Sequence, residues 1–241
     1  YAMRYKNPSL KKTLESWEGE NFKQIIILPL FPHYASATNG SVIEEAMNVI
    51  KKWWVIPELS FISQFYNEEF YLKGFEEKGN AHDFKEYDHI LFSFHGLPER
   101  HVDKVYKDGL CKDNDCEHGI NDENVFCYKA TCYETAIQLA KRFKLKEEDY
   151  TVGFQSRLGR GWIEPFSDEI IIDLAKKGAK KLLVFSPAFV ADCLETIIEI
   201  GDEYQELFEE HGGEKVQLVE SLNSSETFVH GLKEMILKRS L

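Results

Sequence analysis

The residues most able to do chemistry in this sequence begin with a histidine at the end of a short apolar run. His95 directly follows residues 88–94, a run typical of a buried strand. An imidazole has an unperturbed pKa of about 6.5, so at a strand end it can accept a proton at neutral pH. Gly96 predicts space there for a bulky ligand, and His33 could line the same cleft. The alternative for each histidine is a structural role.

Three glutamates, Glu195, Glu199 and Glu203, follow one another at intervals of four residues. In a helix over residues 192–210 this spacing puts them on one face, where like charges repel. They form either a solvated acidic surface or a row of carboxylates that passes protons or hydrated divalent cations, which prefer hard oxygen ligands. Their position after a strand-end loop favours the second interpretation.

Trp162 lies in a glycine-rich loop together with Arg157 and Arg160. An indole can stack on a flat aromatic ligand, and guanidinium groups can pair with its carboxylates. The alternative is that Trp162 fills the core. A flat, apolar, dianionic ligand would use all of these groups. Further aromatic residues at strand ends could extend the apolar wall, namely Phe31, Tyr34 and Phe189.

Four of the five cysteines fall in one polar segment, which also contains Asp113 and Asp115. An odd number of cysteines without a secretion signal favours a reducing compartment, where clustered thiols bind metal more often than they form disulfides. The spacing leaves three alternatives open, which are an iron–sulfur cluster, a structural zinc and free thiols. The clustered residues are Cys111, Cys116, Cys127 and Cys132, whereas Cys193 stands apart and suits burial.

Short apolar, β-rich runs alternate with amphipathic stretches along the chain. This alternation predicts an α/β fold with parallel sheets and crossover helices. Such sheets bind ligands beyond the carboxyl ends of their strands, so we expect the strand-end residues to share one cleft. The predicted strands cover residues 24–30, 59–65, 88–94, 150–156, 181–186 and 215–220. The predicted helices cover residues 41–53, 132–142, 165–177, 192–210 and 225–239.

The composition excludes several classes of protein. With 43% hydrophobic residues among 241, the chain can bury one large core or two small ones. It contains no apolar run of about 18 residues, so we expect no transmembrane segment. A net charge of -12 argues against a nucleic-acid partner, because phosphate binding needs a basic surface. The first residue is Tyr1 rather than a methionine, so we expect the true start of the protein to lie upstream.

Four segments together resemble one family, the ferrochelatases, which insert ferrous iron into a porphyrin. The segments run in the family's order and span nearly the whole chain. They are Phe31-Pro32-His33-Tyr34 with Thr38 and Gly40-Ser41, Phe92-Ser93-Phe94-His95-Gly96-Leu97-Pro98, Phe154-Gln155-Ser156-Arg157 with Gly159, Trp162 and Pro165, and Phe189-Val190-Ala191-Asp192-Cys193-Leu194-Glu195-Thr196.

The resemblance implies roles for the residues that match the family's motifs. His95 matches the histidine that takes a pyrrole proton or binds the metal, and Glu195 matches the acidic partner across the pocket. Glu199 and Glu203 match a line of carboxylates that leads from this pocket, so these four residues are the implied metal ligands. Substrate contacts are implied for Arg4, Tyr5 and Trp162, and the strand-end positions of Phe31, Tyr34 and Phe189 predict the same for these three residues.

The resemblance also implies two Rossmann-like domains with a protoporphyrin or coproporphyrin between them, the first domain being incomplete. Residues 1–87 and 225–241 would form the N-terminal domain, and residues 88–224 the C-terminal domain with a cysteine-rich loop at 108–132. That loop resembles the insertion by which some bacterial ferrochelatases bind a 2Fe-2S cluster. The implied groups are therefore Fe²⁺ as substrate and a 2Fe-2S cluster, or structural zinc, on the loop.

Cys193 stands where many ferrochelatases have a histidine, which leaves His95 as the strong imidazole candidate at the centre. Two rival functions remain open. The first is a sirohydrochlorin-type cobalt or iron chelatase of the same fold, and the second is a non-enzymatic metal or redox module built on the cysteines. We expect a cytoplasmic protein, with peripheral contact at the inner face of the cell membrane as a further alternative.

Overall fold

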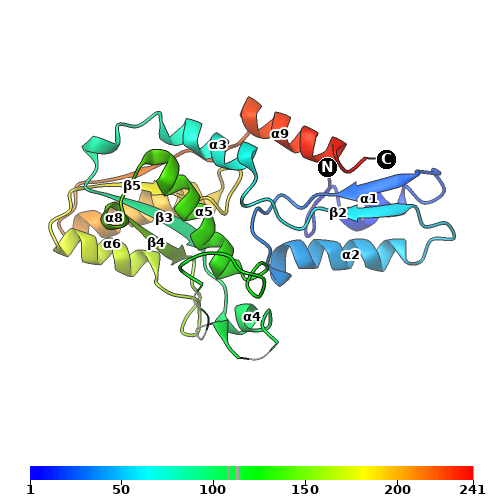
Figure 1. The fold of residues 1–241 in the computed structure, drawn as a ribbon, viewed down its shortest axis with the longest axis horizontal. Helices are drawn as coiled ribbons and strands as arrows, with labels where there is room; N and C mark the ends of the chain where they lie inside the picture. Colours follow the sequence, from blue (N-terminus) through cyan, green and yellow to red (C-terminus); the bar gives the residue numbers. More distant parts are fainter. Residues whose placement is uncertain (108, 112–113, 115, 241) are drawn as a thin grey trace.

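The structure is a computed structural model that describes all residues except 108, 112–113, 115 and 241. The expected cysteine-rich loop at 108–132 therefore includes residues outside the described part, among them Asp113 and Asp115. Figure 1 shows a smaller part built on two strands and a larger part built on four.

The smaller part is a two-stranded parallel sheet packed against two helices. β1 (Gln24–Ile27) pairs with β2 (Glu58–Phe61). α2 (Ser41–Ile50) lies on the crossover between these strands, and α1 (Leu10–Glu15) packs beside α2. The apolar faces of both helices are buried against the strands, as expected of amphipathic helices. The buried residues of this core are Leu10, Leu14, Ile25, Ala46, Val49, Ile50 and Trp53.

The larger part contains a four-stranded parallel sheet in the order β4-β3-β5-β6. The crossover from β3 to β4 contains α5 (Tyr128–Phe143), and the next crossover, through α6 (Ser167–Lys176), returns past β3 to β5. The strand order therefore reverses beside β3, and open α/β sheets bind ligands at such a point. The four strands are β3 (His89–His95), β4 (Tyr150–Gln155), β5 (Lys181–Phe185) and β6 (Lys215–Leu218).

Both faces of the four-stranded sheet are buried. Phe92 and Phe94 belong to the largest core cluster, whereas Leu91 belongs to the cluster on the opposite face. The first face is covered by α5 and α3 (Glu69–Gly79), and the second by α6 and α8 (Tyr204–Glu210). Double burial explains why these strands read as continuous apolar runs in the sequence.

The last helix, α9 (Glu226–Leu237), reaches from the larger part to the smaller one. It packs along α3, where the Thr227 hydroxyl donates a hydrogen bond to the Glu77 carboxylate. Beyond its end, the carbonyl oxygen of Arg239 accepts a 2.8 Å hydrogen bond from Nε2 of Gln24, the first residue of β1. The division of the chain into two domains stays a prediction.

The α/β fold class is confirmed, and all six predicted strands are present. The continuous helix predicted over residues 192–210 is wrong, because it is divided into α7 (Leu194–Ile197), a π-helical turn (Glu199–Glu203) and α8. In the turn, the backbone N–H of Glu203 donates to the carbonyl oxygen of Ile198, five residues back, at 2.9 Å. Gly201 lies in the turn, and glycine has low helix propensity.

Three helices, α1, α3 and α4 (Glu99–Asp103), were not predicted from the sequence pattern. In α3 the pattern is interrupted by Gly74 and Gly79, which are poor helix formers. The structure gives both glycines a packing role, because a Cβ at Gly74 would lie 2.8 Å from the Leu222 side chain and one at Gly79 would lie 2.4 Å from Phe143. Within the described residues, no helix has the length and apolarity needed to cross a membrane.

Candidate active site and candidate metal centre

His95 is the last residue of β3, the strand beside which the strand order reverses. It pairs in register with Gln155, the last residue of β4. Its half-buried imidazole lies 6.1 Å from the ring of Phe189, which follows β5. The ends of three neighbouring strands therefore meet around His95.

The hydrogen bonds of His95 determine what its ring can do. Nδ1 lies 2.6 Å from the carbonyl oxygen of Gly96. A carbonyl oxygen can only accept, so Nδ1 carries the proton in this contact. In the neutral imidazole, Nε2 then keeps its lone pair and can accept a proton or bind a cation. The hydroxyl of Tyr128 donates a 2.8 Å hydrogen bond to the backbone carbonyl of His95 and fixes the strand end.

Gly96 makes room for protein rather than for a ligand, which corrects the expectation from the sequence. A Cβ at this position would lie 2.8 Å from the carbonyl oxygen of Gln155 and 3.2 Å from Cε3 of Trp162. The half-buried indole of Trp162 therefore packs on Gly96, one residue from His95. Trp162 thus lies where it can form one wall of a site centred on His95.

Of the two arginines near Trp162, Arg157 is already paired within the protein, whereas Arg160 is exposed. Arg157 forms ion pairs with Asp168 at 2.8 Å and with Glu169 at 2.9 Å. Its guanidinium also lies 3.9 Å from the ring centroid of Phe166. These contacts hold Arg157 against the start of α6.

Glu195 lies half-buried in α7 and is connected to the His95 strand end through Gln155. Nε2 of Gln155 donates a 2.8 Å hydrogen bond to the backbone carbonyl oxygen of Glu195. Because Gln155 also pairs with His95 in the sheet, one residue joins the two predicted catalytic groups. Burial raises the pKa of the nearby Cys193 thiol, and the Glu195 carboxylate raises it further.

Two buried serines fix the orientation of the Gln155 amide. Its Oε1 accepts hydrogen bonds from the hydroxyls of Ser93 at 2.8 Å and Ser186 at 3.3 Å. These hydroxyls leave the amide nitrogen directed towards α7. Gln155 was quoted for the resemblance but given no role. The signal that could have identified it is its polar character at the end of a buried strand.

Glu199 accepts hydrogen bonds on both oxygens, although the sequence implied a metal ligand. Ser156 donates to it through the backbone N–H at 2.7 Å and through the hydroxyl at 2.5 Å. Gln155 Nε2 donates at 3.2 Å and the Tyr204 hydroxyl at 3.3 Å. Ser156 has a φ of 60°, in the left-handed region, so the Glu199 contacts hold a strained backbone. Glu203, at the end of the π-helical turn, is exposed.

Arg4 and Tyr5 lie together at the beginning of α2. Nε of Arg4 donates to the Ser41 hydroxyl at 3.0 Å, and the Tyr5 hydroxyl lies 3.3 Å from the same oxygen. Nη2 of Arg4 is 3.9 Å from the Glu45 carboxylate. Tyr5 is 75% exposed, so its ring can contact a ligand.

Tyr34 lies beside a cavity of about 610 Å³, a size common for small-molecule sites. Its hydroxyl would be 3.0 Å from a Cβ at Gly40, and its ring is 5.7 Å from that of Phe126. Phe31 is 41% exposed. His95 and Glu195 lie outside the cavity lining, which includes Tyr34, Ser36, Leu97, Val105, Phe126 and Tyr128.

His33 does not line the cleft, which corrects the second expectation for a histidine. It is buried among aromatic rings, and burial lowers its pKa to about 3. Nε2 of His33 lies 2.9 Å from the Thr135 hydroxyl, which itself donates to the carbonyl oxygen of Tyr66. His33 is therefore a neutral structural residue that joins the segment after β1 to α5.

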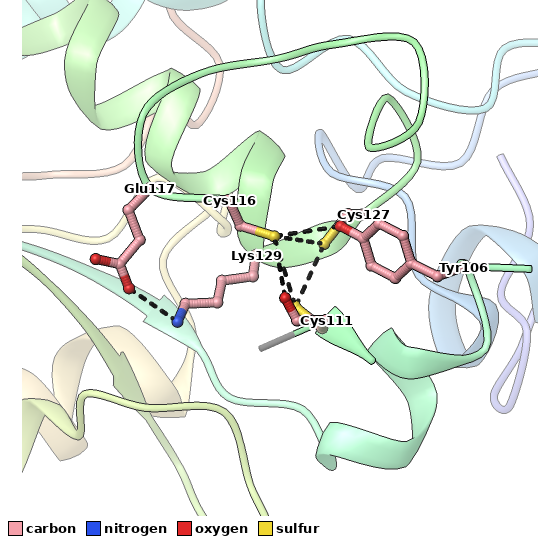
Figure 2. A network of polar contacts seen from close by, with 6 residues as sticks. All are labelled: Tyr106, Cys111, Cys116, Glu117, Cys127 and Lys129. Atoms are coloured by element: carbon pink, nitrogen blue, oxygen red, sulfur yellow. Dashed lines mark hydrogen bonds and ion pairs between the residues drawn. The ribbon is translucent and has the colours of Figure 1, made fainter. Parts of the chain in front are cut away.

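Three of the four clustered cysteines converge, as Figure 2 shows. The Sγ–Sγ distances are 3.7 Å for Cys111 and Cys116, 3.8 Å for Cys111 and Cys127, and 3.9 Å for Cys116 and Cys127. In the described part of the chain, no other three His, Cys, Asp or Glu side chains lie close enough to hold a metal. All three residues are buried. The sequence thus located a candidate metal centre.

Cys132 does not join the other three cysteines, although the sequence grouped it with them. The helix predicted from residue 132 begins instead at Tyr128, so Cys132 lies inside α5 on its buried face. Burial raises the pKa of Cys132 well above its ordinary value, which favours the neutral thiol. Cys132 therefore packs in the core, whereas Cys127 lies beside Cys111 and Cys116.

Two groups adjoin the three thiols (Figure 2). The Tyr106 hydroxyl lies 3.2 Å from Sγ of Cys116. Lys129 forms a 3.0 Å ion pair with Glu117 beside the cluster. Hydrogen bonds from Cys111 and Cys116 lower the pKa of Cys127, so this thiol loses its proton most readily. Tyr106 was not recognised from the sequence.

Comparison with known proteins identifies a family for this chain. The ferrochelatase family profile matches residues 1–240. The ferrochelatase of Ectopseudomonas mendocina is 42% identical over 235 residues, which cover 96% of this chain and 69% of the relative. The ferrochelatase of Pseudomonas syringae pv. syringae is 41% identical over 237 residues, which cover 97% of this chain and 70% of the relative.

Solved structures show the same fold at low identity. SirB from Bacillus subtilis with Fe³⁺ matches with a TM-score of 0.63 and 13% identity, over 97% of this chain and 78% of that one. The sirohydrochlorin chelatase SirB from Bacillus subtilis subspecies spizizenii with cobalt matches with a TM-score of 0.60 and 10% identity. This match covers 98% of this chain and 77% of that one. The fold of this chain is thus the α/β fold of these chelatases. The family match is more specific, and the chain belongs to the ferrochelatase family, lyases that insert iron into porphyrin in heme biosynthesis.

Proposed function

We propose that this chain inserts Fe²⁺ into protoporphyrin IX or coproporphyrin III, with His95 and Glu195 at the reaction centre. The observation that carries the proposal is the arrangement around Gln155. This residue pairs with His95 in the sheet, and its amide binds the backbone of Glu195. Both groups are thereby attached to the same sheet edge, at the point where the strand order reverses.

The reaction requires a base, because a porphyrin loses two N–H protons when a divalent metal enters. Nε2 of His95 is available as an acceptor, since Nδ1 donates to the Gly96 carbonyl. Glu195 supplies a carboxylate from α7 that can take the second proton or bind the incoming cation. Each proton then leaves to solvent, and the iron replaces both at the pyrrole nitrogens.

The remaining carboxylates differ in what they can contribute. Glu199 already accepts hydrogen bonds from Ser156 and Gln155 on both oxygens, so we assign it the positioning of the Ser156 turn and of α7. Glu203 is exposed and free to receive hydrated Fe²⁺ from solvent. The row of glutamates thus divides into an entry residue, a positioning residue and a residue at the reaction centre.

The aromatic residues supply the surface that a macrocycle needs. Trp162 and Phe189 lie next to His95 from two different strand ends. Tyr34 and Phe31 belong to the segment after β1, and Arg4 with Tyr5 could meet the carboxylates at the porphyrin edge. Porphyrin contact by these six residues is part of the proposal.

The test is an assay of metal insertion into porphyrin. The reaction is monitored through the loss of porphyrin fluorescence or the change in the porphyrin's visible spectrum. We expect His95→Ala and Glu195→Gln each to lower kcat by about 100-fold or more, the usual contribution of a positioned acid–base group. Glu206→Gln in α8 is a matched control, because Glu206 is an exposed glutamate further along the same segment. Near-normal kcat in His95→Ala would overturn the proposed role.

A second arm of the same assay compares porphyrin with sirohydrochlorin. The structural neighbours include a sirohydrochlorin chelatase, but at 10–13% identity they show the fold alone. Sirohydrochlorin carries many more carboxylates and would favour a basic pocket. Arg157 is instead paired with Asp168 and Glu169. We expect insertion into porphyrin, and insertion into sirohydrochlorin alone would overturn the proposal.

We further propose that Cys111, Cys116 and Cys127 bind a metal, either in a 2Fe-2S cluster or as a structural zinc. Their three sulfur atoms are buried and lie within 3.9 Å of one another. All five cysteines are free thiols, in keeping with the expected cytoplasmic location, which stays a prediction together with membrane contact.

A further inference from the structure

We infer that the three converging cysteines form a mononuclear, tetrahedral thiolate site for a zinc-like divalent ion, rather than the ligand set of an iron–sulfur cluster. This inference rests on the proposed metal binding by Cys111, Cys116 and Cys127 and does not depend on the porphyrin reaction. On binding, the three thiols lose their protons to solvent and form three metal–sulfur bonds.

The distances between the sulfur atoms carry the inference. A tetrahedral ion with metal–sulfur bonds of about 2.3 Å places its sulfur ligands about 3.8 Å apart. The three observed Sγ–Sγ distances are 3.7, 3.8 and 3.9 Å. They describe a nearly equilateral triangle of the size that one ion requires. A fourth ligand would complete the tetrahedron above that triangle.

A two-iron cluster requires a different shape. It is held by four thiolates, two on each iron, and the inorganic sulfides separate the two irons. Any three of its cysteines therefore include a pair on different irons, whose sulfur atoms lie much further apart than ligands of one ion. The triangle contains no such long edge, and Cys132, the fourth cysteine of the sequence cluster, lies outside it. The residues present therefore do not fit a 2Fe-2S cluster.

Hydrophobic packing alone does not explain why these thiols converge. The neighbours in the sequence are larger apolar residues, Leu110 before Cys111 and Phe126 before Cys127. Leu110 is 41% exposed and Phe126 is 46% exposed, whereas the adjacent cysteines are buried. A segment ordered by apolar burial would turn the larger side chains inward, because buried apolar area sets the gain. At these two positions the thiols turn inward instead.

A metal crosslink would also tie this segment to the rest of the fold. Between α4 and α5, residues 104–127, the described residues form neither α-helix nor strand. Connections of this length without secondary structure are uncommon in compact domains and usually have a specific function. An ion held by Cys111, Cys116 and Cys127 ties two points within the segment to the start of α5.

Tyr106 is placed to support the negative charge of the site. Three thiolates on a divalent ion carry a net negative charge, and the Tyr106 hydroxyl lies 3.2 Å from Cys116 Sγ. A phenol hydroxyl is a hydrogen-bond donor, so at this distance it can donate to the sulfur. Hydrogen bonds to metal ligands typically change metal affinity by about 10- to 100-fold when removed.

The test is the metal and sulfide content of the whole chain, purified without added metal and again after reconstitution with Zn²⁺ or with iron and sulfide. We expect about one zinc per chain and no acid-labile sulfide. Cobalt substitution should give the strong visible bands of tetrahedral thiolate-bound Co²⁺. Two irons and two sulfides per chain would overturn the mononuclear site but keep metal binding, whereas no bound metal would overturn both.

Variants identify the ligands independently of activity. Cys116→Ser and Cys127→Ser should lose the zinc and the cobalt spectrum. Cys193→Ser and Cys132→Ser should keep both, Cys193 being the control for removal of a thiol and Cys132 the test of the fourth cysteine. Loss of metal in Cys132→Ser with an unchanged circular dichroism spectrum would contradict the three-cysteine assignment. Tyr106→Phe should weaken zinc binding by about 10-fold or more without changing the stoichiometry.

Discussion

The carboxyl-terminal edge of the four-stranded sheet, called the sheet edge below, and the cysteine-rich segment position their functional groups in different ways. At the sheet edge, the backbone register of β3 and β4 and the amide of Gln155 position His95 and Glu195. In the cysteine-rich segment, Cys111 and Cys116 lie outside any α-helix or strand. On our proposals, the first site is fixed before a ligand arrives, whereas the second would be completed by the ion that it binds.

The largest expected effect concerns the sheet edge. Glu199→Ala should lower the free energy of unfolding by about 2–3 kcal/mol, because Ser156 and Gln155 lose a charged acceptor within a partly buried network. Glu203→Ala, at the other end of the π-helical turn, should stay within about 0.5 kcal/mol, since Glu203 is exposed. Urea unfolding of both variants measures the difference. Equal effects would mean that Glu199 does not hold the edge.

The next effect is the loss of folding stability at acid pH. We expect it to come from buried histidines and not from the cysteine thiols. The pKa of His33 is lowered to about 3 by burial, below the value of about 6.5 in the unfolded chain. The unfolded state then binds a proton that the folded state does not, so stability is full above pH 6.5 and falls towards pH 3. The slope should reach about 1.4 kcal/mol per pH unit.

Urea unfolding between pH 7 and pH 5 measures this slope in a Cys116→Ser background, where metal loss cannot contribute. Burial also lowers the pKa of His89 and His82, so these residues act in the same direction. His33→Gln should flatten the dependence. An unchanged slope in that variant would remove His33 as its source.

The smallest effect tests whether the two regions are coupled. Tyr128 follows Cys127 directly, and its hydroxyl donates a 2.8 Å hydrogen bond to the carbonyl oxygen of His95. Tyr128→Phe should cost about 1 kcal/mol of stability, the value of one hydrogen bond, and leave the zinc content unchanged. Porphyrin metal insertion should fall if this contact aligns His95. Loss of zinc in this variant would show that the two regions are not independent.

The sequence predicted the sheet edge better than the cysteine-rich segment, for a physical reason. Buried strands are recognisable in the sequence as apolar runs. The residue after a parallel strand lies at the carboxyl end of the sheet, where ligands bind. His95 and the positions of Trp162 and Phe189 follow from that rule. In the irregular segment, no periodic pattern shows which way each side chain points. Cys132 was therefore grouped with the other cysteines, although it belongs to the buried face of α5.

The errors at the sheet edge arise from contacts between distant parts of the chain. Gly96 was read as space for a ligand because nothing in the local sequence shows that Trp162 fills it. Glu199 was read as a free carboxylate because Ser156, its main partner, is 43 positions away in the chain. Such contacts depend on the tertiary arrangement of α7 against β4.

The π-helical turn at Glu199–Glu203 limits how this region can evolve. Such a turn holds one more residue than the α-helical turn it replaces, and its looser hydrogen bonding has a local cost. Because the turn takes up this residue locally, its removal would restore a regular helix and leave α8 on the same buried face. The deletion would instead change the spacing between Glu195 and the carboxylates that follow it. The extra residue therefore acts as a local spacer that leaves the direction of α8 unchanged.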